Sequence, residues 1–198
     1  MINSKIKVEK REAQEMSPLP ENIYQVELLD VTDEERPTYD TRNKPDEEKE
    51  YETILNFQFV LLAGKDKDGS SLRGRSVWAN FIPTYLYISK KNGKNKLYQI
   101  TEALLGRELT PEDEAKMDGE FINSLIGKQI RVGTKNKTND NGTFTNIDVY
   151  YSADTELEKL SDEERKKATP TKEKEEHTGT PVDEIVDEGI NPEDIPFD

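Results

Sequence analysis

Apolar and polar residues alternate most clearly over residues 51–62, and this period of two predicts a β-strand. Phe57 and Phe59 fall on its apolar face, whereas Asn56 and Gln58 fall on its polar face. We therefore assign Phe57 and Phe59 to the hydrophobic core.

Similar runs predict four more strands, at residues 23–29, 72–81, 128–134 and 144–151. The apolar phase of the first strand shifts at Leu28 and Leu29, which predicts a β-bulge there. Residues 32–50 are strongly charged and are predicted to form a long loop.

Between the third and fourth strands the period changes to that of a helix. Residues 95–105 place Leu97, Ile100 and Leu104 on one side, and Gly106 is a natural stop. Thr110 followed by proline is typical of a capped helix start, and a second short apolar face precedes Gly127.

The order of elements predicts a mainly β fold. Three strands, one or two short helices and two strands follow one another as in a five-stranded OB-like barrel. A split sheet capped by helices gives the same order. We place this domain at residues 21–152, after a flexible N-terminal arm at 1–20 and before a disordered acidic interaction tail at 153–198.

Composition narrows the class of protein. The 198 residues are 32% hydrophobic and 35% charged, so a second full core is not expected. The chain has no Cys, which excludes disulfides and thiolate metal sites and fits a reducing cytosol. His177 is the single histidine, so no metal site and no cofactor are expected. No apolar run approaches the roughly 20 residues of a membrane span, and there is no signal-peptide pattern. We expect a soluble cytoplasmic protein with no membrane partner.

The net charge of −14 is unevenly distributed. Residues 153–198 hold 16 acids and 6 bases, whereas residues 65–151 hold 14 bases and 11 acids. The central segment is therefore mildly basic, and the mean charge alone does not exclude nucleic-acid binding.

The C-terminal end combines acidity with an apolar tip. From His177 onward there are seven acids and no Lys or Arg, which predicts disorder. The residues near its end are predicted to bind a partner protein: Asp194, Ile195, Pro196 and Phe197.

This Asp-Ile-Pro-Phe ending resembles the tail tip of bacterial single-stranded DNA-binding proteins. Residues 74–81 (GRSVWANF) resemble the third strand of small phage-encoded members, and residues 104–106 and 125–128 resemble their passage from helix to strand. Two features depart from the family, namely the acidic 32–50 loop and Asp198, which follows the phenylalanine on which the bacterial tail ends.

The resemblance implies an OB-fold that coats single-stranded DNA during phage DNA replication, recombination or repair in the host bacterial cytoplasm. It also implies a tail that recruits a polymerase, helicase, primase or recombinase and competes with DNA for the groove. A homodimer is compatible with the sequence, which is silent on oligomeric state.

Sequence-independent binding of single strands needs cations for phosphates and aromatic rings for bases. Trp78 shares its strand phase with small or polar residues, which favours a groove position over the alternative of a core tryptophan. For Phe144 and Tyr150 stacking and core-edge positions remain equal alternatives. The candidate DNA-binding residues are Arg73, Arg75, Trp78, Phe81, Tyr85, Tyr87, Lys90, Lys91, Lys94, Arg131, Lys135, Lys137, Phe144 and Tyr150.

Other functions have less support. The acidic pairs lack a neighbouring His or Cys, and no phosphate loop, dinucleotide fingerprint or zinc spacing occurs, so no enzyme is expected. The alternatives are an acidic protein-interaction adaptor or DNA mimic, and an RNA-binding OB-fold protein, because stacking and phosphate contacts do not sense the 2′-hydroxyl.

Overall fold

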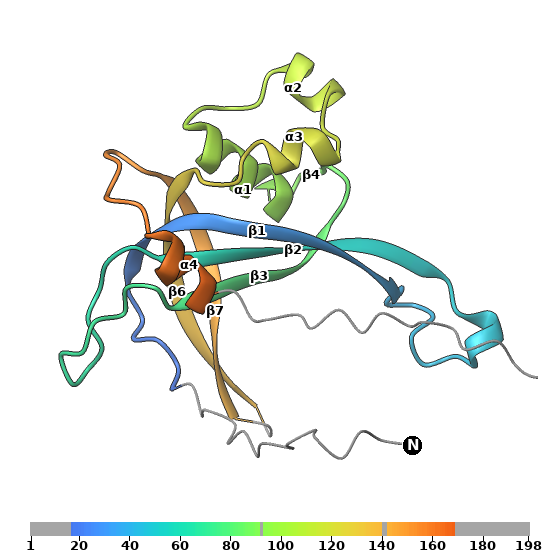
Figure 1. Cartoon of the computed structure of the whole chain (residues 1–198). Coiled ribbons are helices and arrows are strands. Elements are labelled where there is room, and N and C mark those ends of the chain that lie inside the picture. Colours follow the sequence, from blue (N-terminus) through green and yellow to red (C-terminus); the bar gives the residue numbers. More distant parts are fainter. Residues whose placement is uncertain (1–16, 92, 140–141, 169–198) are drawn as a thin grey trace, which may run out of the picture.

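The computed structural model describes residues 17–91, 93–139 and 142–168, and its main feature is a five-stranded antiparallel sheet (Figure 1). The prediction of a mainly β protein is confirmed. The strand order is β3-β2-β1-β6-β7, with β1 (Ile23–Pro37), β2 (Tyr51–Leu61), β3 (Ser76–Pro83), β6 (Gln129–Asn139) and β7 (Gly142–Ser152). In the described residues β3 and β7 are the two edges of the sheet and form no ladder with each other.

The remaining elements are short. They are the hairpin β4 (Ile88–Ser89) and β5 (Gly93–Lys94), the 3-10 helix η1 (Asp46–Glu48), and the helices α1 (Lys96–Leu105), α2 (Pro111–Ala115), α3 (Gly119–Asn123) and α4 (Asp162–Ala168). Three helices therefore lie between the third and fourth strands of the sheet, instead of the predicted one or two. No helix in the described ranges is long and apolar enough to cross a membrane.

One face of the sheet and one side of α1 form the core. Phe57 and Phe59 are fully buried, as predicted, and their rings stack with centroids 6.3 Å apart. Leu97 and Ile100 of α1 join the same cluster. Burial of these alternating positions stabilises the pairing of β2 with its neighbours.

The predicted helix signals are confirmed. Asn95 caps α1 by accepting a hydrogen bond from the Tyr98 amide, and Gly106 ends the helix in the left-handed conformation. Thr110 and Asp113 form a capping box around Pro111 at the start of α2.

The first strand is longer than predicted. The bulge between Leu28 and Asp30 is confirmed, but β1 then continues through residues 32–37, which were expected to belong to a loop. These residues pair with β2 as far as Pro37 opposite Tyr51. Beyond the last pair of β3, Pro83 with Ile54, the two strands continue as a two-stranded extension, residues 35–53 (Figure 1). A ribbon with mostly solvent-exposed faces needs no apolar alternation, so its charged sequence looks like a loop.

The third strand starts later than predicted, at Ser76 instead of residue 72. Gly74 has a φ of 85° and its amide bonds to the Leu61 carbonyl, which makes a turn immediately before the strand. That conformation favours glycine, so the strand begins only after it.

The chain after β7 continues into a packed segment, the latch (residues 153–168). Leu160 packs with Val60 and Leu62 on the face of β2 opposite the core. Arg73 donates hydrogen bonds to the carbonyls of Leu62, Glu158 and Lys159 at 3.0–3.1 Å. The predicted disordered tail thus has a packed beginning, and the boundary at Ser152 does not coincide with the end of the packed chain.

Ion pairs complete the latch. Arg165 pairs with Glu27, which is fully buried on β1, and Arg73 pairs with Glu164 at 3.0 Å. The Arg73 guanidinium lowers the pKa of Glu164 from 4.5 to about 2. Because the pKa of Glu164 is lower in the folded protein, the ion pair stabilises the fold at every pH above the ordinary pKa of the carboxyl group. This stabilisation is lost as the pH falls through about 2. The latch pair is therefore in place at neutral pH.

Candidate nucleic-acid interface

A groove of about 670 Å³ lies between the two edge strands. We call it the edge groove. Its walls come from residues 17–19, residues 75–81, Lys96 at the start of α1, and residues 143–147 of β7. Because the backbones of β3 and β7 are not joined there, side chains from both edges are open to a ligand that enters between them.

Three aromatic side chains line the edge groove: Trp78 and Phe81 from β3 and Phe144 from β7. Trp78 is half-buried and lies outside the core cluster, in agreement with its strand phase. Phe81 is 62% exposed and Phe144 is 48% exposed. Rings from two strands on one groove provide flat surfaces for nucleobases.

Tyr150 does not join them. The ladder between β6 and β7 pairs Gly133 with Val149 and Thr134 with Ile147, so Asp148 is an extra residue in a bulge. The bulge shifts the strand phase and packs Tyr150 against the core, where burial raises the pKa of its hydroxyl. Of the two alternatives for Tyr150, the structure thus selects the core edge.

The two arginines of the third-strand region have separate environments. Arg75 lines the edge groove, where its guanidinium donates to the Ser17 carbonyl and lies 3.8 Å from Asp66. Arg73 does not line the groove, and its guanidinium instead donates to the Glu158 and Lys159 carbonyls of the latch. Arg73 thus has a structural role, and its DNA contact stays a prediction.

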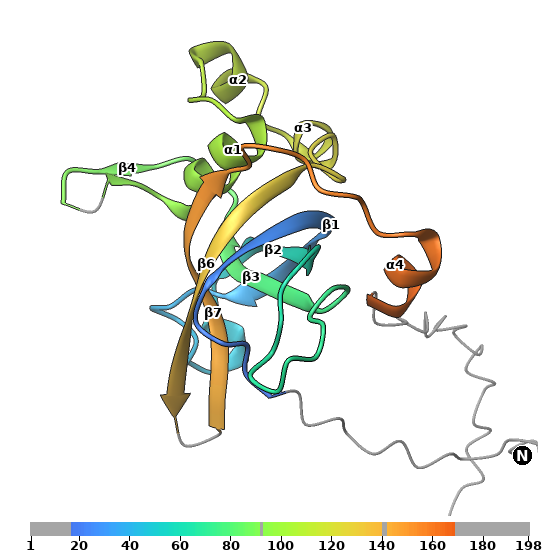
Figure 2. The same ribbon diagram turned by 90° about the vertical axis from the view of Figure 1, so that its left-hand side faces the viewer.

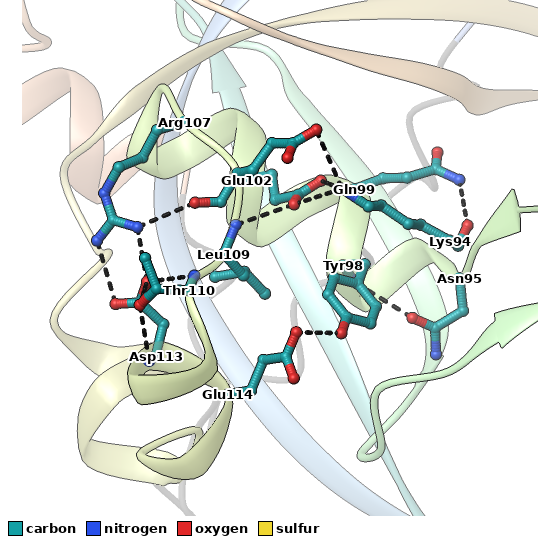
Figure 3. A network of polar contacts seen from close by, with 11 residues as sticks. Lys94, Asn95, Tyr98, Gln99, Glu102, Arg107, Leu109, Thr110, Asp113 and Glu114 are labelled. Atoms are coloured by element: carbon teal, nitrogen blue, oxygen red, sulfur yellow. Dashed lines mark hydrogen bonds and ion pairs between the residues drawn. The ribbon is translucent and has the colours of Figure 1, made fainter.

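The lysines after β3 also divide. Lys96 is exposed and lines the edge groove, although it is not among the candidate DNA-binding residues named from the sequence. Lys94 is bound to Glu102 at 2.7 and 3.0 Å, which raises its pKa, and Glu102 also accepts the Leu109 amide (Figure 3). Lys94 thus stabilises the helical region, and a phosphate would have to displace Glu102.

The helical region near Lys94 is held by further pairs (Figure 3). Arg107 forms a two-point contact with Asp113, which lowers the pKa of that carboxyl. Tyr98 donates to Glu114, and this hydrogen bond raises the pKa of Tyr98 to about 12. These contacts fix α1 and α2 relative to the start of the groove.

The β4–β5 hairpin projects from the body beside α1 (Figure 2). Tyr85 and Tyr87 precede it and are more than half exposed, and Lys90 and Lys91 are exposed beyond β4. None of these four residues lines the edge groove. Their predicted DNA contacts therefore lie outside the edge groove.

The basic residues of β6 differ in their surroundings. Arg131 is paired with Asp154 at 2.9 Å, at the start of the latch. Lys135 is paired with Asp148 at 2.6 Å. Lys137 is exposed and lies directly opposite Phe144 in the ladder, so the two share a face.

Asp148 marks a basic cluster beside the groove. Its pKa is lowered by the hydrogen bond from Lys135 and by the charges of Lys135, Lys137 and Lys96. Three lysines from β6 and α1 therefore lie near Asp148, and Glu21 is a second carboxylate near Lys135.

A second cavity, of about 430 Å³, lies between β1, β2 and α3, and its rim includes Asp33 and Asp118. Two carboxylates on its rim make it less suited to phosphates than the edge groove. Within the described ranges no group of three or more metal-ligating side chains occurs. The predicted tail tip at residues 194–197 lies outside the described residues.

The sequence matches no protein-family model and no curated protein. The edge groove, its aromatic rings and its charges are therefore the features from which a function can be inferred.

Proposed function

We propose that this protein binds single-stranded DNA, without sequence preference, in the edge groove. The observation that carries the proposal is the set of three partly exposed rings, Trp78, Phe81 and Phe144, on two facing sheet edges. Stacking on such rings contributes about 1–3 kcal/mol per base and tolerates every base. Arg75, Lys96 and Lys137 supply positive charge for the phosphates.

The strand order supports a finer description of the fold. The order β3-β2-β1-β6-β7, with helices between β3 and β6, agrees with an OB-fold whose last contact would join β3 to β7. We propose that the sheet is an OB-like barrel left open at the edge groove.

The biological role follows the family resemblance of the sequence. We propose a phage-type protein that protects exposed strands in the host cytoplasm during replication or recombination. Its acidic tail recruits a replication or recombination protein.

The test is a titration of the full chain, using Trp78 as the probe because the chain has a single tryptophan. Oligo-dT at low salt should quench its fluorescence, whereas duplex DNA should bind much more weakly. Trp78→Ala should weaken the binding of oligo-dT by about 1–3 kcal/mol without lowering the melting temperature. The anisotropy of labelled oligo-dT measures this affinity.

The rival functions give different results. An adaptor or DNA mimic would leave Trp78 fluorescence unchanged with oligo-dT, even at low salt, where electrostatic binding is strongest. An RNA-binding protein would prefer oligo-rU to oligo-dT of the same length.

A further inference from the structure

We propose that Phe81, Asn56 and Arg36 form a seat for one unpaired nucleobase at the end of the edge groove where the extension begins. The inference rests on the proposed function and adds two residues, Asn56 and Arg36, that no sequence motif indicates.

The backbone of Phe81 is strained. Its φ is 61°, and among the described residues it is the single non-glycine residue with a positive φ. Bulky side chains avoid this conformation, which Asn and Gly adopt more readily. The ring is 62% exposed, so its burial in the core does not offset the strain. A strained, exposed aromatic residue on a groove points to a functional constraint.

A bulge produces this conformation. The ladder pairs Leu55 with Ile82 and then Phe57 with Ala79, so Asn56 alone faces the two residues Asn80 and Phe81. Such a bulge changes the direction in which a side chain, here that of Phe81, leaves the strand.

Asn56 holds the bulge in place. Its Oδ1 accepts the Phe81 amide at 3.1 Å, and its Nδ2 donates to Glu34 at 3.3 Å. The amide that the bulge removes from the ladder is therefore satisfied by a side chain from β2, which is itself bonded to β1.

Arg36 supports one face of the ring. Its guanidinium carbon lies 4.4 Å from the centroid of Phe81, a cation–π contact. A base that stacks on the other face of the ring completes a stack of guanidinium, phenyl ring and base. The same guanidinium places a positive charge beside the nucleotide. Bases inside a duplex already stack on each other, so the seat selects an unpaired base.

The experiment compares variants in the full chain, with oligo-dT carrying one 2-aminopurine as the ligand. Phe81→Asn keeps a residue that tolerates positive φ but removes the ring. It should weaken binding by about 5- to 150-fold and reduce the 2-aminopurine quenching. Its melting temperature should be equal to or higher than that of the unmodified chain. Phe81→Trp should retain binding.

Arg36→Gln tests the seat without touching the bulge, and it should lower both affinity and 2-aminopurine quenching. Its matched control is Arg42→Gln, because Arg42 makes a similar contact, 4.2 Å from the ring centroid of Tyr39, in the outer part of the extension. The control should bind as the unmodified chain does.

The outcomes separate the seat from the function on which it rests. If the unmodified chain does not bind oligo-dT, both proposals fail. If it binds with quenching of Trp78, but Phe81→Asn and Arg36→Gln bind equally well, the seat is wrong and the edge groove remains.

Discussion

Single residues decide which side chains of β7 reach the groove. Gly133 lies at the bulge opposite Val149, and a Cβ atom at this position would lie 2.5 Å from Val149 Cγ2. Only a residue without a side chain fits there unless Val149 moves. The bulge in turn sets Tyr150 toward the core and leaves Phe144 partly exposed on the groove.

Gly133→Ala should therefore destabilise the protein by about 1–3 kcal/mol, the usual cost of overpacking. The free energy of unfolding in urea measures the effect. Gly119→Ala is the matched control, since its Cβ would meet nothing within 4 Å. Adding Val149→Ala to Gly133→Ala should recover part of the loss, and no recovery would contradict the steric explanation.

Lys94 and Lys96 lie on either side of Asn95 and are predicted to differ in their effect on the salt dependence of DNA binding. Lys96→Ala removes an exposed charge from the groove wall, so the slope of log affinity against log salt should fall by about 0.7, one phosphate on a single strand. Lys94→Ala removes a charge already paired with Glu102. It should lower stability and leave the salt slope almost unchanged. Equal slopes for the two variants would contradict this assignment of the groove wall.

At the scale of elements, a single arginine, Arg73, contributes more to holding the latch on the sheet than the apolar contacts of the latch do. In the latch Arg73 contacts two carbonyls, those of Glu158 and Lys159, and the Glu164 carboxylate. The buried apolar side chain of the latch is Leu160. Removal of one partner from such a network leaves the others unsatisfied.

Arg73→Ala should release the latch without unfolding the sheet. Trypsin should then cleave more rapidly at Lys159 and Arg165, and amides of α4 should exchange faster. Arg107→Ala is the matched control, because it removes another arginine–carboxylate pair, with Asp113, from α2. Unchanged cleavage in Arg73→Ala would show that the remaining contacts of the latch, which include Leu160 and the pair of Arg165 with Glu27, suffice.

At the scale of the whole molecule, the last described residue of the latch, Ala168, lies beside the edge groove. The Ala168 carbonyl accepts hydrogen bonds from Ser76, which lines the edge groove, and from Gln58. Residues 169–198 carry ten acids and two lysines. A tethered segment of this charge reaches effective concentrations in the mM range at a nearby basic surface.

A chain that ends at Ala168 should bind oligo-dT more tightly than the full chain, most strongly at low salt, because screening weakens the competition. Anisotropy at several salt concentrations measures it. Equal affinities at low salt would exclude competition by the tail. Phe197→Ala keeps every charge, so a gain in affinity there would indicate docking of the tip.

The point of truncation matters for this experiment. A chain that ends at Ser152 would expose Val60 and Leu62 to water and would remove Arg165, the ion-pair partner of Glu27. Loss of this apolar burial and of the ion pair destabilises the sheet. That shorter chain should unfold more easily, and its DNA affinity would not report on the tail alone.

Local patterns in the sequence were sufficient for the mainly β class, the core positions of Phe57 and Phe59, the bulge after Leu28, the end of α1 at Gly106 and the capped start of α2 at Thr110. Each of these depends on the period of one strand or on a few neighbouring residues. The position of Trp78 outside the core followed from its phase in the same way.

The tertiary structure alone decided the partners of the polar residues. Arg73 and Arg75 are two positions apart, yet one holds the latch and the other lines the groove, because Arg73 meets Glu164 from far along the chain. Lys94 and Lys96 differ for the same reason. The seat at Phe81 depends on the register of β2 against β3, and the edge groove on two strands distant in sequence. Periodicity reports the face on which a side chain lies, whereas its partners depend on how distant segments pack.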